Sequence, residues 1–460
     1  MTPNADTIAA IATPPGIGGI AVIRISGPRS WDVARLLGSP SVHGGIKGGL
    51  EIAQNSVKHA HIYNNNNELI DEALISFFKS PHSYTGEDVV EVSCHGGNIS
   101  SKRILKLTLS HDVRMARPGE FTERAFLNGK LDLAQAEAVA GLIHARSEAS
   151  ARTALSQLAG KLSGHIREMR TKTLDLLALL ELELDFSEED VSFQSLESRK
   201  ADLLELQRQI EHLISTFARG RIEREGLRVA IVGAPNAGKS TLLNRIVGDE
   251  RAIVSPHPGT TRDVVEAHLE LSGHEVIFQD TAGLRESSHE IEAIGMERTR
   301  KALNRADIVL LLVDSASRDL PGTEILSEIS SKNAIIVLNK CDIIGSESFL
   351  PPTEFKLSGT KTIKISALTG DGVEELLSEL THRFTHELET AGDLIITESR
   401  HHDALRRSSE AIERARSLFH EPTLMASDLR DAANALGEIT GETIGEEVLD
   451  RIFSKFCIGK

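Results

Sequence analysis

Three short runs of the sequence have the residue types and the order that a nucleotide-binding site needs. The first is GAPNAGKS, Gly233 to Ser240, which fits the pattern GxxxxGK[ST] between an expected strand and an expected helix. Its glycines let backbone N–H groups curl around phosphates, while Lys239 would reach the β- and γ-phosphate oxygens and Ser240 would bind Mg²⁺. The positive end of the following helix favours the same anion.

The second and third runs select the base. NKCD, Asn339 to Asp342, follows another expected strand, and the Asp342 carboxylate can accept hydrogen bonds from N1–H and the 2-amino group of guanine. Adenine lacks that pair of donors, and a carboxylate left unpaired discriminates by about 10⁴-fold. Lys340 would pack its stem along the base, and SAL, Ser366 to Leu368, would offer backbone N–H groups to guanine O6. The three runs together predict GTP, not ATP, as the ligand.

Two further runs fall where a γ-phosphate is sensed. PGTTRD contains two threonines, Thr260 and Thr261, and spacing alone leaves open which of them binds Mg²⁺. In FQDTAGLRES a strand is expected to end at Asp280, close to the metal, and the N–H of Gly283 would meet the γ-phosphate. The next residue is Leu284. Many GTPases have a water-orienting glutamine there, and leucine can neither donate nor accept a hydrogen bond.

The composition is that of an ordinary globular protein, and it excludes several classes. A chain of 460 residues suggests two to four domains. Lys and Arg number 51 against 67 Asp and Glu, and the net charge of -16 excludes a general nucleic-acid coat, so any RNA contact needs a local basic face or a basic partner. The cysteines, Cys94, Cys341 and Cys457, form no CxxC pair, which favours a reducing compartment. No apolar run reaches the roughly 18 residues of a membrane span, and we expect a cytoplasmic protein without membrane contact.

Composition also changes along the chain, and the changes predict a multidomain α/β and α protein. Residues 1–124 carry short β-branched runs broken by Gly, Pro and Asn clusters, as in an α+β domain. Residues 125–222 and 389–460 have helical periodicity, and residues 223–388 alternate strands with helices, which favours a parallel-rich sheet flanked by helices. The second helical set would bury little surface alone, so we expect one helical domain with a P-loop G domain inserted into it. The expected strands of the insert are LRVAIVG, HEVIFQD, DIVLLLVD, AIIVLNK and TIKISA.

Longer runs carry a family resemblance over essentially the whole chain. They are GAPNAGKS, PGTTRD, DTAGLRES, DTIAAIATPPGIGGIAVIRISG, TGEDVVEVSCHGG, RPGEFTERAFLNGKLDLAQAEA and the terminal FCIGK. Together they resemble the MnmE, or TrmE, family of tRNA modification GTPases, and the last two are far more specific than the general GTPase motifs. The resemblance implies an N-terminal folate-binding and dimerisation domain, a Ras-like G domain, and a helical domain that ends in the CIGK motif.

The resemblance also implies a replacement for the missing glutamine. GTPases of this family are activated by dimerisation of their G domains and depend on K⁺. Asn236 is similar to the family's K⁺ ligand, with the backbone carbonyls of Ser255 and His257 and with Thr260 nearby, and Thr261 is then the Mg²⁺ ligand beside Ser240. K⁺ there would offset the charge between the β- and γ-phosphates in place of an arginine finger.

The catalytic candidates are Glu292, Asn236 and Cys457. Glu292, in HEIEAIG, matches the family's water-positioning glutamate, and a solvated helix carboxylate is the alternative. For Asn236 the alternative to the K⁺ ligand is a turn-forming residue. Cys457 lies in an apolar tail that we expect to dock, and it is either a reactive or proton-transfer group or a small buried hydrophobe.

The predicted nucleotide-binding residues combine all of these motifs. They are Asn236, Ala237, Gly238, Lys239, Ser240, Thr241, Ser255, Pro256, His257, Pro258, Gly259, Thr260, Thr261, Asp280, Thr281, Ala282, Gly283, Asn339, Lys340, Asp342, Ser366, Ala367 and Leu368.

The same resemblance assigns a second ligand to the first domain, which is akin to the aminomethyltransferase of the glycine cleavage system. Arg24, Glu91, Lys130 and Lys460 would line a site for 5-formyl- or 5,10-methylene-tetrahydrofolate. Glu91 would hydrogen-bond the pterin, and the basic side chains would meet polar or anionic parts of the ligand. Ordinary ion pairing is the alternative for these four residues.

The resemblance further implies a reaction and its partners. The chain would form a homodimer and work on tRNA with the flavoprotein MnmG (GidA), in a heterotetramer or a larger complex. The product would be a carboxymethylaminomethyl or aminomethyl group on C5 of the wobble uridine of certain tRNAs. One alternative is a ribosome-assembly GTPase switch, although the sequence shows neither a second P-loop nor a KH-like GxxG module. The other is a folate-dependent aminomethyltransferase with a regulatory G domain.

The K⁺ assignment makes a direct prediction. GTP turnover should be much faster in K⁺ than in Na⁺ at equal ionic strength, because only a cation that fits the Asn236 site can offset charge beside the β- and γ-phosphates. Steady-state phosphate release in the two salts measures this. Equal rates would remove the role assigned to Asn236.

Overall fold

The computed structural model of the chain describes residues 6–37, 56–185, 195–248, 265–280, 299–343, 360–388 and 394–459. The chain divides into two compact units. The first comprises Met1–Ala140, Gln157–Arg199 and Glu410–Lys460, and the second comprises Gly141–Ser156 and Lys200–Ser409. None of the helices in the described ranges combines the length and the apolarity that crossing a bilayer requires.

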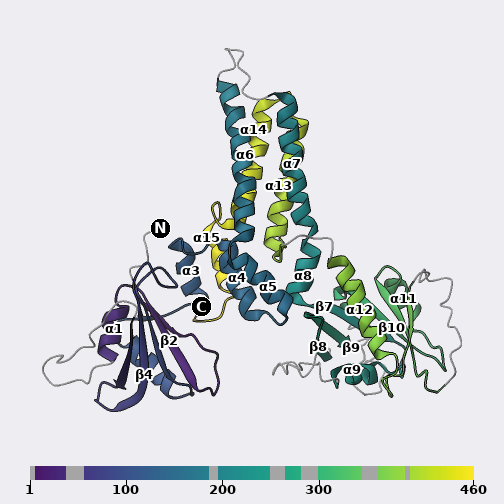
Figure 1. The fold of residues 1–460 in the computed structure, drawn as a ribbon, viewed down its shortest axis with the longest axis horizontal. Helices are drawn as coiled ribbons and strands as arrows, with labels where there is room; N and C mark the ends of the chain where they lie inside the picture. Colours follow the sequence, from purple (N-terminus) through teal and green to yellow (C-terminus); the bar gives the residue numbers. More distant parts are fainter. Residues whose placement is uncertain are drawn as a thin grey trace. The chain divides into compact units, whose positions relative to one another are not determined.

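The first unit contains a six-stranded sheet (Figure 1). Its order is β3-β4-β5-β2-β1-β6, and its neighbours are antiparallel except for the parallel pair β1 and β6. The strands are β1 (Ile8–Ile11), β2 (Ile20–Ser26), β3 (Val57–Tyr63), β4 (Leu69–Phe78), β5 (Val89–His95) and β6 (Arg114–Met115). This sheet with its helices confirms the α+β class expected for the N-terminal region.

Side chains alternate between the two faces of this sheet, as a period of two requires. One face packs on α1 (Ser30–Leu37) and α2 (Ser100–Leu109) around Ile23, Ile75 and Val92. The register Arg24↔Glu91, Val22↔Ser93 and Leu74↔Ser93 puts these five residues on the other face. Helix α3 (Glu120–Leu127) covers that face over β1, through the buried side chains of Ile8, Ala10 and Phe121.

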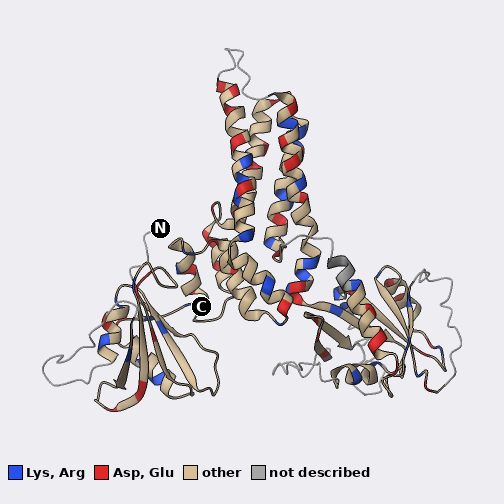
Figure 2. Ribbon diagram, in the orientation of Figure 1, with Lys and Arg blue, Asp and Glu red and all other residues tan. Residues whose placement is uncertain are grey.

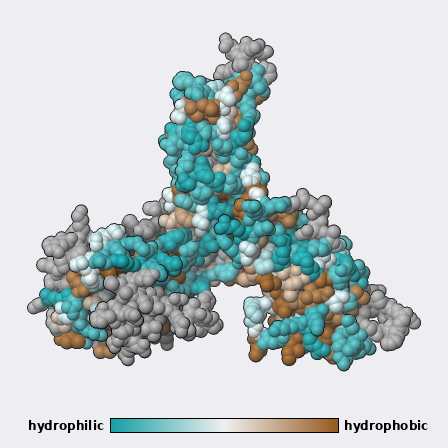
Figure 3. All heavy atoms as spheres, turned by 180° about the vertical axis from the view of Figure 1, so that it is seen from behind, coloured by the Kyte–Doolittle hydropathy of each residue, from teal (hydrophilic) through white to brown (hydrophobic). Residues whose placement is uncertain are grey.

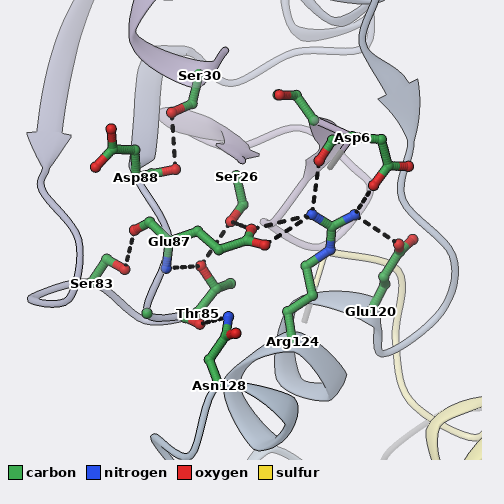
Figure 4. A network of polar contacts seen from close by, with 12 residues as sticks. Asp6, Ser26, Ser30, Ser83, Thr85, Glu87, Asp88, Glu120, Arg124 and Asn128 are labelled. Atoms are coloured by element: carbon green, nitrogen blue, oxygen red, sulfur yellow. Dashed lines mark hydrogen bonds and ion pairs between the residues drawn. The ribbon is translucent and has the colours of Figure 1, made fainter. Parts of the chain in front are cut away.

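A fully buried arginine ties α3 to the strands (Figure 4). Arg124 is 2% exposed, and its guanidinium donates to Asp6 Oδ1 at 2.8 Å, to Glu120 Oε1 at 3.2 Å and to Glu87 Oε2 at 3.2 Å. Glu120 is itself 0% exposed and also accepts from Arg114 at 2.6 Å. A charge inside a protein is tolerated only when it is paired in this way, so the network fixes where α3 lies on the sheet.

The remaining helices of the first unit build an elongated core. Helix α6 (Lys161–Asp185) packs along α14 (Pro422–Thr440), and Figure 1 shows them side by side. Helix α4 (Leu133–His144) meets α15 (Glu446–Phe453) in an apolar cluster that contains Leu133, Phe453 and Phe456. The helical periodicity expected on both sides of the insert is therefore confirmed. Acidic and basic residues interleave along the long helices (Figure 2).

The second unit contains the other six-stranded sheet, in the order β12-β11-β10-β7-β9-β8. All neighbours are parallel except β8 and β9. The strands are β7 (Leu227–Gly233), β8 (Val265–Leu271), β9 (His274–Asp280), β10 (Ile308–Asp314), β11 (Ala334–Asn339) and β12 (Thr362–Lys364). The five expected strands are confirmed. The antiparallel edge strand β8 is an addition that the parallel interpretation did not include.

Helices cover both faces of this sheet. Apolar side chains of α9 (Lys239–Val247) and α12 (Val373–Leu388) pack on one face. Those of α11 (Thr323–Ile329) and of the helical residues 299–305 pack on the other. Central strands are therefore buried on both sides, as their continuous apolar runs indicate.

Helix α8 (Phe217–Glu225) lies wholly in the second unit. Three helices have residues in both units: α5 (Glu148–Leu158), α7 (Leu196–Ser215) and α13 (Ser399–Ser417). The chain enters the α/β segment through α8 and leaves it through residues 394–398, and these two stretches touch. The N–H of Ile396 donates to Thr216 Oγ1 at 3.2 Å. A Cβ on Gly220 would lie 2.0 Å from the carbonyl oxygen of Ile396, so only glycine permits this approach.

The buried arginine predicts a large stability effect. Arg124→Ala should lower the free energy of unfolding by about 3–5 kcal/mol, because it removes the arginine that pairs with Glu87 and one of the arginines that pair with the buried Glu120. Arg117→Ala is the matched control, since the Arg117 side chain is 54% exposed and such pairs contribute at most about 1 kcal/mol. Urea unfolding of both variants measures the difference. Equal losses would contradict the stabilising role of the buried network.

The same network predicts acid sensitivity. Burial alone would raise the pKa of Glu120, but hydrogen bonds from Arg114 and the Arg117 N–H hold that pKa below its ordinary value of 4.5. The stabilisation is thus complete above about pH 4.5 and is lost as the pH falls through the lowered folded-state pKa.

Candidate nucleotide and folate sites

The loop GAPNAGKS joins β7 to α9, as the sequence predicts. Two of its residues need a left-handed backbone, Asn236 with φ 64° and Gly238 with φ 98°. A Cβ on Gly238 would lie 2.2 Å from Asn339 Nδ2, so the glycine permits a close approach between two loops. The local geometry is that of a loop wound to present N–H groups to an anion.

Lys239 and Ser240 start α9 beside this loop. The Lys239 ammonium donates to the carbonyl oxygens of Gly233 and Ala234, at 2.8 Å each, and the side chain is 7% exposed. Ser240 is exposed in the first helical turn. In the register of the parallel pair β7 and β9, Asp280 stands opposite Ile231. The Ser240 hydroxyl therefore lies next to the loop, and an oxygen ligand of this kind fits the preference of Mg²⁺.

The base-recognition runs are joined through one buried amide. Asn339 is 2% exposed; its Nδ2 donates to the carbonyl oxygen of Ala237 at 2.8 Å, and its Oδ1 accepts from the N–H of Ala367 at 2.9 Å. The three predicted runs therefore meet at a single side chain. Sequence reasoning did not assign this bridging role, because an asparagine at a strand end carries no signal of its partners.

Lys340 and Asp342 follow Asn339 in the expected places. Lys340 has φ 65°, and its ammonium forms an ion pair with Asp314 Oδ2 at 2.7 Å. Burial alone would raise the pKa of Asp314, but the hydrogen bond from Lys340 leads the contributions that hold it below the ordinary value. Asp342 is exposed, so its carboxylate is accessible to a base. Ser366 is buried, whereas Leu368 is 69% exposed.

In the first unit, Arg24 and Glu91 meet on the sheet face that α3 partly covers. Arg24 Nε lies 2.9 Å from Glu91 Oε1, and a second guanidinium nitrogen lies 2.8 Å from the same oxygen. The guanidinium also sits over two rings, 5.1 Å from the centroid of Tyr84 and 5.7 Å from that of Phe121. Burial raises the pKa of Tyr84, so this phenol stays protonated. Paired charges next to aromatic rings fit a ligand with a flat polar head such as a pterin.

The C-terminal tail reaches this place. Its Gly459 carbonyl oxygen accepts from Arg24 at 3.4 Å, Ile458 pairs with Pro118, and the carbonyl of Cys457 accepts from the Gly119 N–H at 3.3 Å. The expectation that the tail docks is confirmed. Cys457 itself is exposed, so the interpretation as a small buried hydrophobe is wrong. Phe453 and Phe456 supply the buried contacts instead.

The other predicted folate residues are placed only in part. Lys130 is exposed and donates to the carbonyl oxygen of Pro81 at 3.1 Å. Lys460 lies outside the described residues, as does the side chain of Asp280. So do the remaining predicted residues: Ser255, Pro256, His257, Pro258, Gly259, Thr260, Thr261, Thr281, Ala282, Gly283 and Glu292.

Family models and curated relatives match this chain over almost its whole length. A family model described as "MnmE helical domain" matches residues 133–457, and one described as "GTP-binding protein TrmE N-terminus" matches residues 7–130. The chain is 42% identical over 474 residues to "tRNA modification GTPase MnmE" of Chlorobium chlorochromatii, covering 99% of this chain and 98% of that protein. It is also 42% identical over 464 residues to the protein of the same description from Clostridioides difficile, covering 99% of each.

Among solved structures, Era of Aquifex aeolicus bound to GDP.AlF4- is 31% identical, with a TM-score of 0.26. The match covers 40% of this chain and 65% of that one.

The bridging amide predicts a binding defect. Asn339→Ala should weaken GDP binding by roughly tenfold or more, because it leaves the buried Ala237 carbonyl and the Ala367 N–H without their partner, at about 1–3 kcal/mol each. Titration with a fluorescent GDP measures the dissociation constant. Asn333→Ala, at an exposed position before β11, is the control and should bind like the parent protein. Equal affinity of the two variants would show that the bridge is unimportant.

Proposed function

Since the chain belongs to the MnmE family of tRNA modification GTPases, we propose that it hydrolyses GTP while adding an aminomethyl-type group to C5 of the tRNA wobble uridine. The observation that carries this proposal is the meeting of a P-loop, an NKCD run and an SAL loop at Asn339, in a chain that also pairs Arg24 with Glu91 beside aromatic rings. The first arrangement suits a guanine nucleotide and the second a one-carbon folate.

Guanine selection rests on Asp342. Its exposed carboxylate follows Lys340, whose left-handed backbone and ion pair with Asp314 fix the direction in which the run leaves β11. The carboxylate accepts from N1–H and the 2-amino group of guanine, while the SAL loop offers N–H groups to O6. The Ala367 N–H donates to Asn339 within the protein, so the amide of Leu368 is the better placed donor.

Phosphate handling rests on residues of α9 and on the two runs that precede and follow the β8–β9 hairpin. Lys239 moves from the loop carbonyls to the β- and γ-phosphate oxygens, an exchange of one set of oxygen acceptors for a charged one. Ser240 and Thr261 hold Mg²⁺, which offsets negative charge on the phosphates when bound. Glu292 orients the attacking water; a Glu292→Ala protein that binds GTP normally and hydrolyses it at the parental rate would reject this role.

We assign K⁺ to Asn236, Ser255, His257 and Thr260. Asn236 is exposed at a left-handed position of the P-loop, so its side chain projects from the loop and suits an oxygen ligand. Two G domains facing each other would exclude water from this cation and strengthen its effect on the phosphates.

The folate is held by Arg24, Glu91, Lys130 and Lys460, with the docked tail as part of the wall. Arg24 is fixed by Glu91 and by the Gly459 carbonyl, so it is oriented before the ligand arrives. Cys457 is accessible, as a reactive or proton-transfer group must be. The bound folate supplies the one-carbon unit.

We propose a homodimer built through the N-terminal domain, with tRNA and MnmG as partners. The sheet face that α3 leaves open exposes apolar side chains, with Ile20 66% and Leu74 49% exposed. Figure 3 shows hydrophobic surface on the part that carries this sheet. A second copy would cover it. We propose that the functional domains are the segments 1–124, 125–222, 223–388 and 389–460. We also propose that the protein is located in the cytoplasm.

Coupling between GTP hydrolysis and the modification step would run through the β8–β9 hairpin. Its turn touches the N-terminal end of α5, because the N–H of Ala149 donates to the Gly273 carbonyl at 3.1 Å. Just before α5, a guanidinium nitrogen of Arg146 lies 3.4 Å from a carboxylate oxygen of Glu275. The hairpin stands between the two runs that sense the γ-phosphate. A shift of those runs on hydrolysis therefore reaches α5 directly.

The test is a nucleoside digest of tRNA from a strain that lacks the gene. We expect the modified wobble uridine to disappear and to return with the parent gene. Complementation with Arg24→Ala should leave GTP hydrolysis intact while the modified nucleoside stays absent, because only the folate site is damaged. An unaltered wobble-uridine profile in the deletion strain would overturn the proposal.

A further inference from the structure

The loop that reads guanine O6 spans a cavity. A cavity of about 490 Å³ lies between α9, α12 and the loop Ser366–Gly372, and Thr241, Asn244, Leu368, Val373 and Leu377 are among its lining residues. Ala367 is buried among apolar side chains of both helices, whereas Leu368 beside the cavity is 69% exposed. Polar contacts must therefore help to set the direction of the peptide that joins these two residues.

Arg245, in the last turn of α9, supplies that support. Its Nε donates to the carbonyl oxygen of Ala367 at 3.3 Å, and a second guanidinium nitrogen donates to the carbonyl oxygen of Leu368. The end of its stem also lies beside Gly370, where an added Cβ would be 3.8 Å from Arg245 Cδ. The planar guanidinium thus holds two successive carbonyls of the loop.

Peptide planarity turns this contact into a direction. In a trans peptide the C=O and the following N–H point in opposite directions. Holding the Ala367 carbonyl therefore aims the N–H of Leu368 away from Arg245. The next peptide obeys the same rule, because the Leu368 carbonyl faces Arg245 and the Thr369 N–H donates to Ser366 Oγ at 3.2 Å.

The buried Asn339 side chain holds the same loop through a second set of hydrogen bonds. Asn339 holds the Ala367 N–H and, through Ala237, the P-loop. Arg245 connects the loop to the helix that begins at the P-loop. The peptide between Ala367 and Leu368 is thus fixed from both directions, and its outward N–H is the one left to address O6.

We propose that Arg245 is a positioning residue for guanine recognition, which orients the Leu368 N–H toward O6 by holding the carbonyls of Ala367 and Leu368. This inference rests on the proposed binding of GTP. It assigns no contact between Arg245 and the nucleotide. The prediction is a loss of O6 recognition that leaves the phosphate contacts in place.

The experiment compares Arg245→Ala, Arg245→Lys and the parent protein by stopped-flow release of fluorescent GDP. We expect Arg245→Ala to release GDP about tenfold faster, as for loss of hydrogen bonds from a charged donor. Arg245→Lys should fall between the two, since one ammonium cannot hold both carbonyls in the same plane. The KM for GTP should rise by a similar factor, with a much smaller change in kcat.

Competition with base analogues separates positioning from a general structural effect. Inosine diphosphate retains O6 and should lose as much affinity as GDP in Arg245→Ala. The diphosphate of 2-aminopurine riboside lacks O6, and its affinity should not change. Equal losses for all three nucleotides would overturn the inference and assign Arg245 a structural role only.

Arg300→Ala is the control variant, because Arg300 forms exposed ion pairs with Glu324 and Glu328 in the same unit. It should release GDP at the parental rate. A parental release rate in Arg245→Ala would reject the inference while leaving the GTPase proposal intact. Failure of the parent protein to bind GDP would reject the proposed function itself. Should Arg245→Ala unfold, judged by its thermal midpoint, Arg245→Lys decides by the same analogue comparison.

Discussion

The nucleotide site depends on one constraint, that parallel strands end at the same edge of a sheet. Gly233 stands opposite Leu312 and Asp314 opposite Asn339, so β7, β10 and β11 finish together. Each of these strands leads into a different part of the site, with the P-loop after β7, the Asp314 carboxylate at the end of β10 and the NKCD run after β11. Loops far apart in sequence thereby come within hydrogen-bond distance without any long-range motif to specify it.

That constraint explains what the sequence could predict. Phosphate binding by backbone N–H groups demands particular conformations at particular residues, and the positive φ values of Asn236 and Gly238 are the visible result. Central strands buried on both faces must be continuously apolar, so they were easy to identify. Edge strand β8 alternates polar and apolar residues instead, and this period-two signal was available although the strand was not among those predicted.

Other features had no local signal. The partners of Asn339 and Arg245 lie 28 or more residues away in sequence, and an amide or a guanidinium does not indicate its acceptors. Cys457 is exposed although the tail docks, because Phe453 and Phe456 are the tail residues that occupy the apolar cluster. Two arginines of the N-terminal region have different roles. Arg124 is buried among three carboxylates and holds α3 in place. Arg24 is partly exposed and can contact a ligand.

The contact between α8 and residues 394–398 has a further consequence. Because Gly220 and Ile396 touch where the chain enters and leaves the α/β segment, some 170 residues close a ring whose two ends are already adjacent. Closing such a ring costs little extra entropy as the enclosed segment grows, since the cost rises only with the logarithm of length. The nucleotide module thus joins the helical region at two adjacent points of the chain, so its length is not limited by the distance between its two ends.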